Sequence, residues 1–415
     1  MMCIEYRLND RDITMPRFNS STVPSVISVY SSSTFTAGVK IYTQATNQLC
    51  EPDYLSDNPS KEVKKQLRAW FKDKPSNKRL NHFQLLKLER YLSAILMNPL
   101  KYGAIPFVDM LYLTIDAPEA VVSTLSRAVK SIPIEHFKLY KTGSTKVLKN
   151  YKDAYQRFAM FENHQSSLIT IYWGLHPKVR EVRPTQRLVK ISLNPARHSP
   201  AEITAFFAWF KSLLGDDSQQ IMEVANVTRL DIAMDLIGVP LPYLLIDRPN
   251  ITIRDFCPNK KDKAQRVGTQ KFGCPKSTCF HAYDKVRKYL DVGPFFVDLL
   301  VYDTAKKRYL PISRTERVFR PADTVPISLG QLQNSPYFLK GTVFYHPMIL
   351  MFLNEKQLNK VIKYGFSFWY HMNSEKRGTL RQFLRKHWML EVNDEQLQSA
   401  QTAALIRLKR LILDA

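Results

Sequence analysis

The segment VTRLDIAMDLI (227–237) places two acidic residues inside an otherwise apolar run. A run of this kind predicts a strand that is buried on at least one face. Because side chains alternate along a strand, both acids lie on one face, together with Arg229 and Ala233. Buried carboxylates are costly unless they pair with a base or bind a cation, and both interpretations stay open. Residues four apart on a strand are separated by about 13 Å, which argues against Asp231 and Asp235 holding the same metal ion directly.

Similar patterns along the middle of the chain predict more strands. These expected strands are 108–115, 168–174, 188–194, 277–285 and 312–320. A helix with Pro118 in its first turn follows Asp116, which is its expected cap. A second helix begins at a capping box of Ser199 and Glu202 and ends before Gly215. The pattern predicts an α+β fold, with a central, mostly antiparallel sheet and helices on one face.

The flanking regions differ from this middle part. Residues 1–105 form a basic, partly helical N-terminal region, and residues 80–98 have the periodicity of a helix. Residues 106–325 contain the predicted sheet, and residues 326–415 have mainly helical patterns. We therefore predict three domains with these boundaries.

The charge of the chain points to an anionic partner. Lys and Arg together number 60 against 37 Asp and Glu, so the formal net charge is +23. Nucleic acid is the commonest partner for such an excess, and an acidic membrane surface is the rival interpretation. No apolar run reaches the roughly 18 residues of a membrane span, and the N-terminal residues lack the apolar stretch of a secretory signal. Five scattered cysteines do not suggest a disulfide framework. We expect a cytoplasmic protein.

Two basic segments are candidates for contacts with DNA. Lys64, Lys65 and Arg68 lie close to Trp70 and Phe71, a mixture of cations and rings that suits a phosphate backbone. The loop 259–271 contributes Lys260, Lys261, Lys263, Arg266 and Lys271. Each segment could instead be a solvated surface.

Two further segments carry side chains suited to chemistry. His281, Tyr283 and Lys285 alternate along a predicted strand, and a neighbouring ammonium would stabilise a tyrosine phenolate as a nucleophile. In the later strand, Glu316 offers hard oxygen ligands and Arg314 a phosphate contact.

In their order, VTRLDIAMDL, FHAYDKVRKY and RTERVFR resemble the core of rolling-circle replication initiators, namely the gene II replication proteins of filamentous phages and the plasmid replication initiation factor family. Those proteins have an R-I/L-D strand, a Y-x-K strand with the DNA-linking tyrosine, and an R-x-E strand. The resemblance covers roughly residues 107–320 and implies a nickase-like core.

The resemblance implies roles for individual residues. Tyr283 would be the nucleophile and Lys285 its neighbouring base, with Asp231 and Glu316 holding Mg²⁺ or Mn²⁺. Asp235 and His281 are further candidate ligands. Arg229 and Arg314 would join the basic segments in contacting DNA.

The implied activity is nicking and rejoining of one origin strand through a 5′-phosphotyrosine, which leaves a 3′-OH primer. Double-stranded origin DNA and single-stranded DNA would be the substrates. The sequence has no P-loop motif, so a host helicase would act with it, alongside polymerase and single-strand binding protein. We expect no membrane partner and leave a homodimer open.

Several alternatives remain at this stage. The chain has no His-hydrophobe-His motif, which other rolling-circle nickases use to bind metal. Cys257, Cys274, Cys279 and His281 could in principle bind zinc, although their spacing matches no common site. The function could also be that of a plasmid mobilisation relaxase or of a non-enzymatic, sequence-specific DNA-binding protein.

Overall fold

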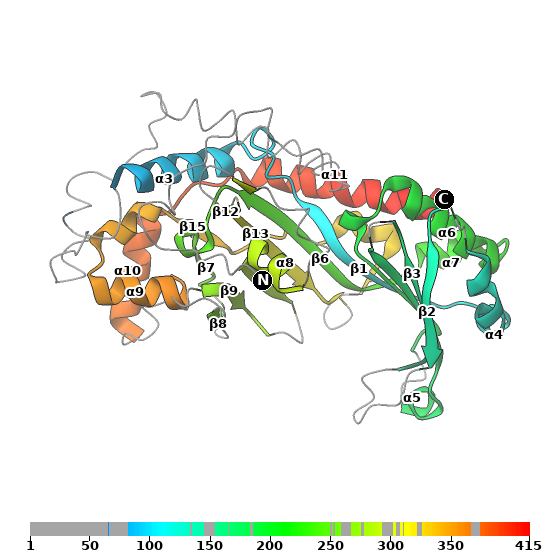
Figure 1. The fold of residues 1–415 in the computed structure, drawn as a ribbon. Coiled ribbons are helices and arrows are strands. Elements are labelled where there is room, and N and C mark those ends of the chain that lie inside the picture. Colours follow the sequence, from blue (N-terminus) through cyan, green and yellow to red (C-terminus); the bar gives the residue numbers. More distant parts are fainter. Residues whose placement is uncertain are drawn as a thin grey trace.

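A computed structural model describes most of the chain beyond residue 81. The described residues are 65, 82–132, 135–144, 154–164, 166–182, 186–249, 251, 254–258, 267–274, 278–292, 302–303, 308–309, 311–321, 326–366 and 374–415. They form an α+β fold around one large antiparallel sheet, as the sequence predicts (Figure 1).

The main sheet of the described part contains 11 strands. Ten of them follow one path, in the order β2 (Lys138–Ser144), β3 (Tyr155–Glu162), β4 (Leu168–Leu175), β5 (Val189–Leu193), β1 (Phe107–Ile115), β6 (Asn226–Ile237), β13 (Ile312–Phe319), β10 (Cys279–Asp284), β9 (Val267–Phe272) and β8 (Arg254–Pro258). The short strand β14 (Ile327–Ser328) pairs with the start of β6. The strand with the two aspartates therefore lies near the middle of the sheet, between β1 and β13.

Helices and two small sheets complete the described structure. The helices are α3 (His82–Met97), α4 (Glu119–Ala128), α5 (Pro177–Val182), α6 (Pro200–Leu214), α7 (Ser218–Glu223), α8 (Lys285–Val292), α9 (Glu355–Tyr364), α10 (Ser374–His387) and α11 (Asp394–Leu413). The small sheets pair β7 (Leu245–Asp247) with β15 (Val343–Tyr345), and β11 (Tyr302–Asp303) with β12 (Arg308–Tyr309).

The two faces of β6 have different environments. Leu230, Ile232 and Met234 are at most 1% exposed and belong to a continuous apolar core with side chains of α3, α6 and α11. Figure 1 shows α3 and α11 running along the same side of the sheet. Since alternate residues point to opposite faces, this packing directs the polar residues of β6 to the other face.

The C-terminal residues share this core. Leu405 and Ile412 of α11 are fully buried in it, and the Asn393 amide donates to the Leu96 carbonyl of α3 over 2.9 Å. The sequence predicts the mainly helical pattern of this region, which contains α9, α10 and α11, but not the strands β14 and β15. The three-domain division stays a prediction, while one continuous core extends from Leu85 to Leu413.

Some elements differ from the sequence expectations. The strands β2, β3, β8 and β9 were not predicted, and β9 takes residues 267–271 from the expected basic loop. The prediction that Asp116 caps a helix is wrong, because α4 begins after Pro118, which makes no side-chain cap. The expected strand 277–285 is shorter, since α8 begins at Lys285.

The register of β1 contains a bulge at Asp109. Val108 pairs with Ile232 and Met110 with Asp231, so Asp109 is an extra residue in β1. A bulge of this kind bends a strand and redirects a side chain. Val108 and Leu111 point into the core on either side of it, which lets Asp109 point toward the polar face.

No helix in the part of the chain that the structure describes is long and apolar enough to cross a membrane.

The predicted capping box at the start of α6 is confirmed. The Ser199 hydroxyl accepts from the Glu202 amide over 3.2 Å, and the Glu202 carboxylate accepts from the Ser199 amide over 2.7 Å. We expect Ser199→Ala to lower the free energy of unfolding by about 1 kcal/mol, because one helical amide loses its acceptor. Denaturant unfolding measures this. The control is Ser123→Ala, an exposed serine of α4 that should change stability by less than about 0.5 kcal/mol.

Candidate active site

Three neighbouring strands bring the predicted residues onto one face of the sheet. In the cross-strand register, Tyr283 of β10 lies opposite Arg314 of β13, and Arg314 lies opposite Asp235 of β6. In the adjacent row, His281 lies opposite Glu316. The three segments that the sequence singles out therefore meet, because their strands are neighbours in the sheet.

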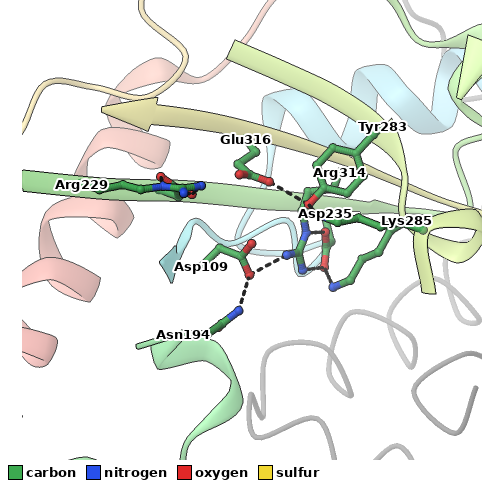
Figure 2. A network of polar contacts seen from close by, with 10 residues as sticks. Asp109, Asn194, Arg229, Asp235, Tyr283, Lys285, Arg314 and Glu316 are labelled. Carbon is green, nitrogen blue, oxygen red and sulfur yellow. Dashed lines mark hydrogen bonds and ion pairs between the residues drawn. The ribbon is translucent and has the colours of Figure 1, made fainter. Parts of the chain in front are cut away.

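Arg314 is at the centre of this face. Its Nε and Nη2 donate to the two carboxylate oxygens of Asp235 over 2.7 and 2.9 Å, and its Nη1 donates to Asp109 over 2.7 Å (Figure 2). The Asn194 side chain also donates to Asp109, over 3.3 Å. Arg314 is 3% exposed, so its charge is balanced by carboxylates rather than by water.

Burial alone would raise the pKa of Asp109, but the cations Arg314, Lys288 and Arg197 together hold it below its usual value. Burial raises the pKa of Asp235, and Arg314 opposes that rise.

Lys285 joins the same cluster from the first turn of α8. Its Nζ donates to Asp235 over 2.7 Å, and the residue is 1% exposed. Burial, with the nearby charges of Arg314 and Lys288, lowers the pKa of Lys285 well below its usual range. An amine of lowered pKa gives up its proton more readily than an exposed lysine does.

The Tyr283 hydroxyl has a carboxylate as its acceptor. It donates to Glu316 Oε2 over 2.7 Å, and Lys288 Nζ lies 3.2 Å from the same hydroxyl. Lys288 also lies 4.3 Å from the centre of the tyrosine ring. The sequence predicts Lys285 beside the phenol, but the ammonium at hydrogen-bond distance is that of Lys288, one helical turn further along α8, while Lys285 donates to Asp235.

The environment of Tyr283 favours its protonated form. Burial raises the pKa of Tyr283 well above its usual value, and the carboxylates Glu316 and Asp109 add to that effect against Arg314. The expected stabilisation of a phenolate is therefore not found, and Glu316 is placed to accept the phenol proton.

Asp231 forms a separate ion pair. Arg229 Nε lies 2.9 and 3.0 Å from its two oxygens, and Arg229 Nη2 lies 2.5 Å from Oδ2. This is the salt bridge that the sequence left open as an alternative to metal binding. Burial raises the pKa of Asp231 to about 7 despite the attraction of Arg229, with Glu316 and Asp109 adding to the rise. The guanidinium of Arg229, a predicted DNA contact, is engaged by this carboxylate.

A cleft of about 440 Å³ opens beside Tyr283. Its lining includes four cations, one carboxylate, hydroxyl groups, an amide and apolar side chains, among them Asp109, Tyr112, Ser167, Thr170, Ser192, Asn194, Arg197, Tyr283, Lys285, Lys288 and Arg314. Such a lining suits a phosphate group and the sugar attached to it.

One asparagine connects two walls of this cleft. Asn163 Oδ1 accepts from the Ser167 amide over 2.8 Å, and its Nδ2 donates to the Arg197 carbonyl over 3.0 Å and to Glu202 over 3.1 Å. The capping box of α6 thereby helps to position Arg197 at the cleft.

The predicted metal ligands share one face of the sheet, but most of them have protein partners. Asp231 is paired with Arg229, and Asp235 with Arg314 and Lys285. His281 Nε2 lies 3.2 Å from Cys279 Sγ, and burial lowers the pKa of His281. Among the residues described, no three His, Cys, Asp or Glu side chains form a group that could hold a metal ion. Binding of Mg²⁺ or Mn²⁺ stays a prediction from the sequence.

The remaining predicted DNA contacts are distributed differently. Lys271 lies in β9, opposite His281, and Lys65 is an exposed helical residue. Lys64, Arg68, Lys260, Lys261, Lys263 and Arg266 lie outside the described residues.

Sequence reasoning missed most residues that line the cleft, among them the charged and amide groups of Asp109, Asn194, Arg197 and Lys288. Lys288 lies one turn after Lys285 in FHAYDKVRKY, so a helix beginning at Lys285 would have pointed to it. Asp109 had no such signal, because its direction depends on the bulge.

No protein-family model matches the chain, and no curated protein has significant sequence similarity to it.

The ion pairs of Asp235 predict a large contribution to stability. We expect Asp235→Asn to lower the free energy of unfolding by about 3–5 kcal/mol, because Arg314 would keep a buried charge with one carboxylate fewer. Denaturant or thermal unfolding measures the change. The control is Glu119→Gln in the surface pair with Arg180, whose side chains are 68% and 63% exposed; it should cost less than about 1 kcal/mol. Equal effects of the two substitutions would contradict the prediction.

Proposed function

We propose that the chain is a rolling-circle replication initiator that nicks and rejoins one strand of origin DNA through Tyr283. The observation that carries this proposal is the position of the Tyr283 hydroxyl, beside a cationic cleft and within 2.7 Å of a carboxylate that can accept its proton. Attack by an oxygen nucleophile on a phosphodiester needs such a base and nearby positive charge.

Glu316 acts as the proton acceptor in this proposal. As the Tyr283 oxygen forms a bond to phosphorus, the phenol proton passes to Glu316 Oε2. This transfer explains how a tyrosine whose pKa is raised well above its usual value can still attack, since a free phenolate never has to exist.

Cations at the cleft stabilise the phosphate during attack. Lys288 lies 3.2 Å from the attacking oxygen, and Arg197 and Arg314 line the same cleft. The phosphorus–3′ oxygen bond breaks as the tyrosine–phosphorus bond forms. Lys285, whose pKa is lowered, supplies the proton that the leaving 3′ oxygen takes up.

The products are a 5′-phosphotyrosine and a free 3′-OH. The ester retains the energy of the original bond, so attack by a 3′-OH reverses the step and rejoins the strand without ATP. In the reverse direction Glu316 returns the proton to Tyr283 and Lys285 takes one from the 3′-OH, as microscopic reversibility requires.

The finer fold interpretation and the partners belong to the same proposal. Strands β6, β10 and β13 would form a nickase-like core with helices on one face, between a basic N-terminal region and a helical C-terminal domain. The substrates would be double-stranded and single-stranded origin DNA, with host helicase, polymerase and single-strand binding protein acting on the displaced strand.

Mg²⁺ or Mn²⁺ stays a prediction from the sequence, and no step above passes through it. The described acids fit a metal poorly, because guanidinium groups already pair with Asp231 and Asp235. A relaxase would use the same chemistry on a different origin, so the site supports either biological role.

A non-enzymatic DNA-binding protein is the second candidate. The burial of Tyr283, which is only 5% exposed, favours it, because a nucleophile must reach its phosphate. Under this alternative the cationic cleft would hold a phosphate without reaction, and the Tyr283–Glu316 bond would be structural.

The first test is a covalent-adduct assay with a labelled single-stranded origin oligonucleotide. We expect Tyr283→Phe to abolish the protein–DNA adduct and to leave duplex binding unchanged, because only the hydroxyl is removed. The matched control is Tyr91→Phe, a buried tyrosine whose hydroxyl donates one hydrogen bond to the Ile237 carbonyl. An adduct that persists in Tyr283→Phe would assign the attack to Tyr289 or to another tyrosine.

The second test concerns Glu316. We expect Glu316→Gln to lose adduct formation at neutral pH and to regain it as the pH rises, by about tenfold per pH unit below the pKa of the phenol. The physical reason is that an amide cannot accept the proton, which must then leave to hydroxide. The measurement is the adduct rate between pH 7 and 9.5, with and without Mg²⁺ or Mn²⁺. Rescue by more metal rather than by pH would make Glu316 a metal ligand.

A further inference from the structure

Beyond the cleft, aromatic and basic side chains continue across the same face of the sheet. In one cross-strand row, Phe158 of β3 lies opposite Tyr172 of β4, and Tyr172 lies opposite Lys190 of β5. In the next row, Ser192 lies opposite Tyr112 of β1. All these side chains are half-buried, whereas the residues on either side of Tyr172, Lys190, Ser192 and Tyr112 in their strands are buried in the core; of the neighbours of Phe158, Ala159 is buried and Arg157 is exposed.

Lys190 lies between two of the rings. Its Nζ is 4.6 Å from the centre of the Tyr112 ring and 5.4 Å from the centre of the Tyr172 ring. Tyr172 in turn has ring contacts with Phe158, at 6.4 Å between centroids, and with Tyr155. A cation held between rings on an accessible sheet can meet a phosphate while bases stack on the rings.

The chain maintains this arrangement at its outer edge. A Cβ atom on Gly143 of β2 would lie 3.0 Å from two atoms of the Phe158 ring. Phe158 therefore lies closely over Gly143, and a larger residue at position 143 would have to displace the Phe158 ring. The contact with Gly143 thus helps to hold the Phe158 ring next to Tyr172.

We propose that Phe158, Tyr172, Lys190 and Tyr112 form a stacking surface for unpaired single-stranded DNA on one side of the cleaved phosphate. The inference rests on the proposed function, since the strand it places is the substrate of Tyr283. Tyr112 and Ser192 line the cleft beside Tyr283, so the surface and the cleft are continuous. Strands β3, β4, β5 and β1 are successive neighbours in the sheet. The bound DNA would therefore cross the sheet from β1 towards β3.

Single-stranded DNA suits this surface better than a duplex does. The rings are presented from a sheet, and only unpaired bases expose the faces that stack on them. The single ammonium between the rings matches one phosphate of the linking backbone, and the excess of basic residues over the whole chain adds general attraction.

The test measures binding of a fluorescent oligothymidine of about 15 nucleotides by anisotropy, with the full chain. We expect Tyr172→Ala and Phe158→Leu each to weaken binding by about tenfold, as loss of one stacked base predicts. Lys190→Gln should weaken binding and reduce the slope of log K against log salt by roughly 0.7. Each variant should leave duplex binding within about twofold.

A lysine–tyrosine pair elsewhere provides matched controls. Lys363 Nζ lies 5.3 Å from the ring centre of Tyr364 on α9, and this tyrosine is 41% exposed. Tyr364→Ala and Lys363→Gln should leave oligothymidine binding unchanged. Equal losses from both pairs, unchanged affinity in Tyr172→Ala and Phe158→Leu, tighter binding of oligouridine RNA, or altered oligomeric state without altered DNA binding would each overturn the inference.

The proposed stacking surface and the proposed nucleophile can be tested independently of each other. Tyr283→Phe should retain oligothymidine binding, because the surface does not use that hydroxyl. If no adduct forms with the unsubstituted protein while Tyr172→Ala still weakens binding, the surface stands and the proposed cleavage is wrong. If the adduct forms and the Tyr172 and Phe158 variants bind normally, the cleavage stands and the surface is wrong.

Discussion

The rest of the site depends on the ion pairs of the buried Arg314 guanidinium with Asp235 and Asp109. Its donors bind Asp235 on the neighbouring strand and Asp109 in the bulge of β1, so a single side chain connects three strands. A buried cation of this kind persists only if carboxylates balance it and accept its hydrogen bonds. The two acids in turn require further donors, which Lys285 and Asn194 provide. These hydrogen bonds place Lys285, the first residue of α8, and Asn194, in the segment before α6, at the cleft.

The same charge balance explains why Tyr283 and the predicted metal ligands differ from expectation. Each aspartate of β6 has a guanidinium partner, and Glu316 alone among the three predicted acids accepts from the tyrosine. Desolvation makes an unpaired buried charge costly, so the fold keeps the tyrosine neutral and places its proton acceptor within 2.7 Å. A reaction that moves the proton and forms the bond together suits this environment better than one that begins from a phenolate.

Sequence patterns predict the elements that alternation and capping specify. Strand β6 and the Ser199 capping box follow from period-two patterns and turn chemistry, whereas the Tyr283, Arg314 and Asp235 segments are grouped only by the resemblance to replication initiators. Lys288 and Asp109 could not be found in this way. The position of Lys288 depends on the strand ending at Asp284, and that of Asp109 on an extra residue in the register with β6. Such features arise from pairing between distant segments, which local periodicity does not record.

The cleft and the proposed stacking surface lie on the same face of the sheet, opposite the face that packs in the core. One face of β1, β4, β5 and β6 is filled by apolar side chains against helices, and this fixes the direction of every alternate residue. The opposite face is therefore positioned by the core even where its own side chains are half exposed. Tyr112 stands where both regions meet, between the Arg229–Asp231 pair and Lys190. If DNA binds on this face, one sheet would position both the phosphate at Tyr283 and the bases on the rings. The alignment of the DNA would then depend on the apolar packing of the opposite face.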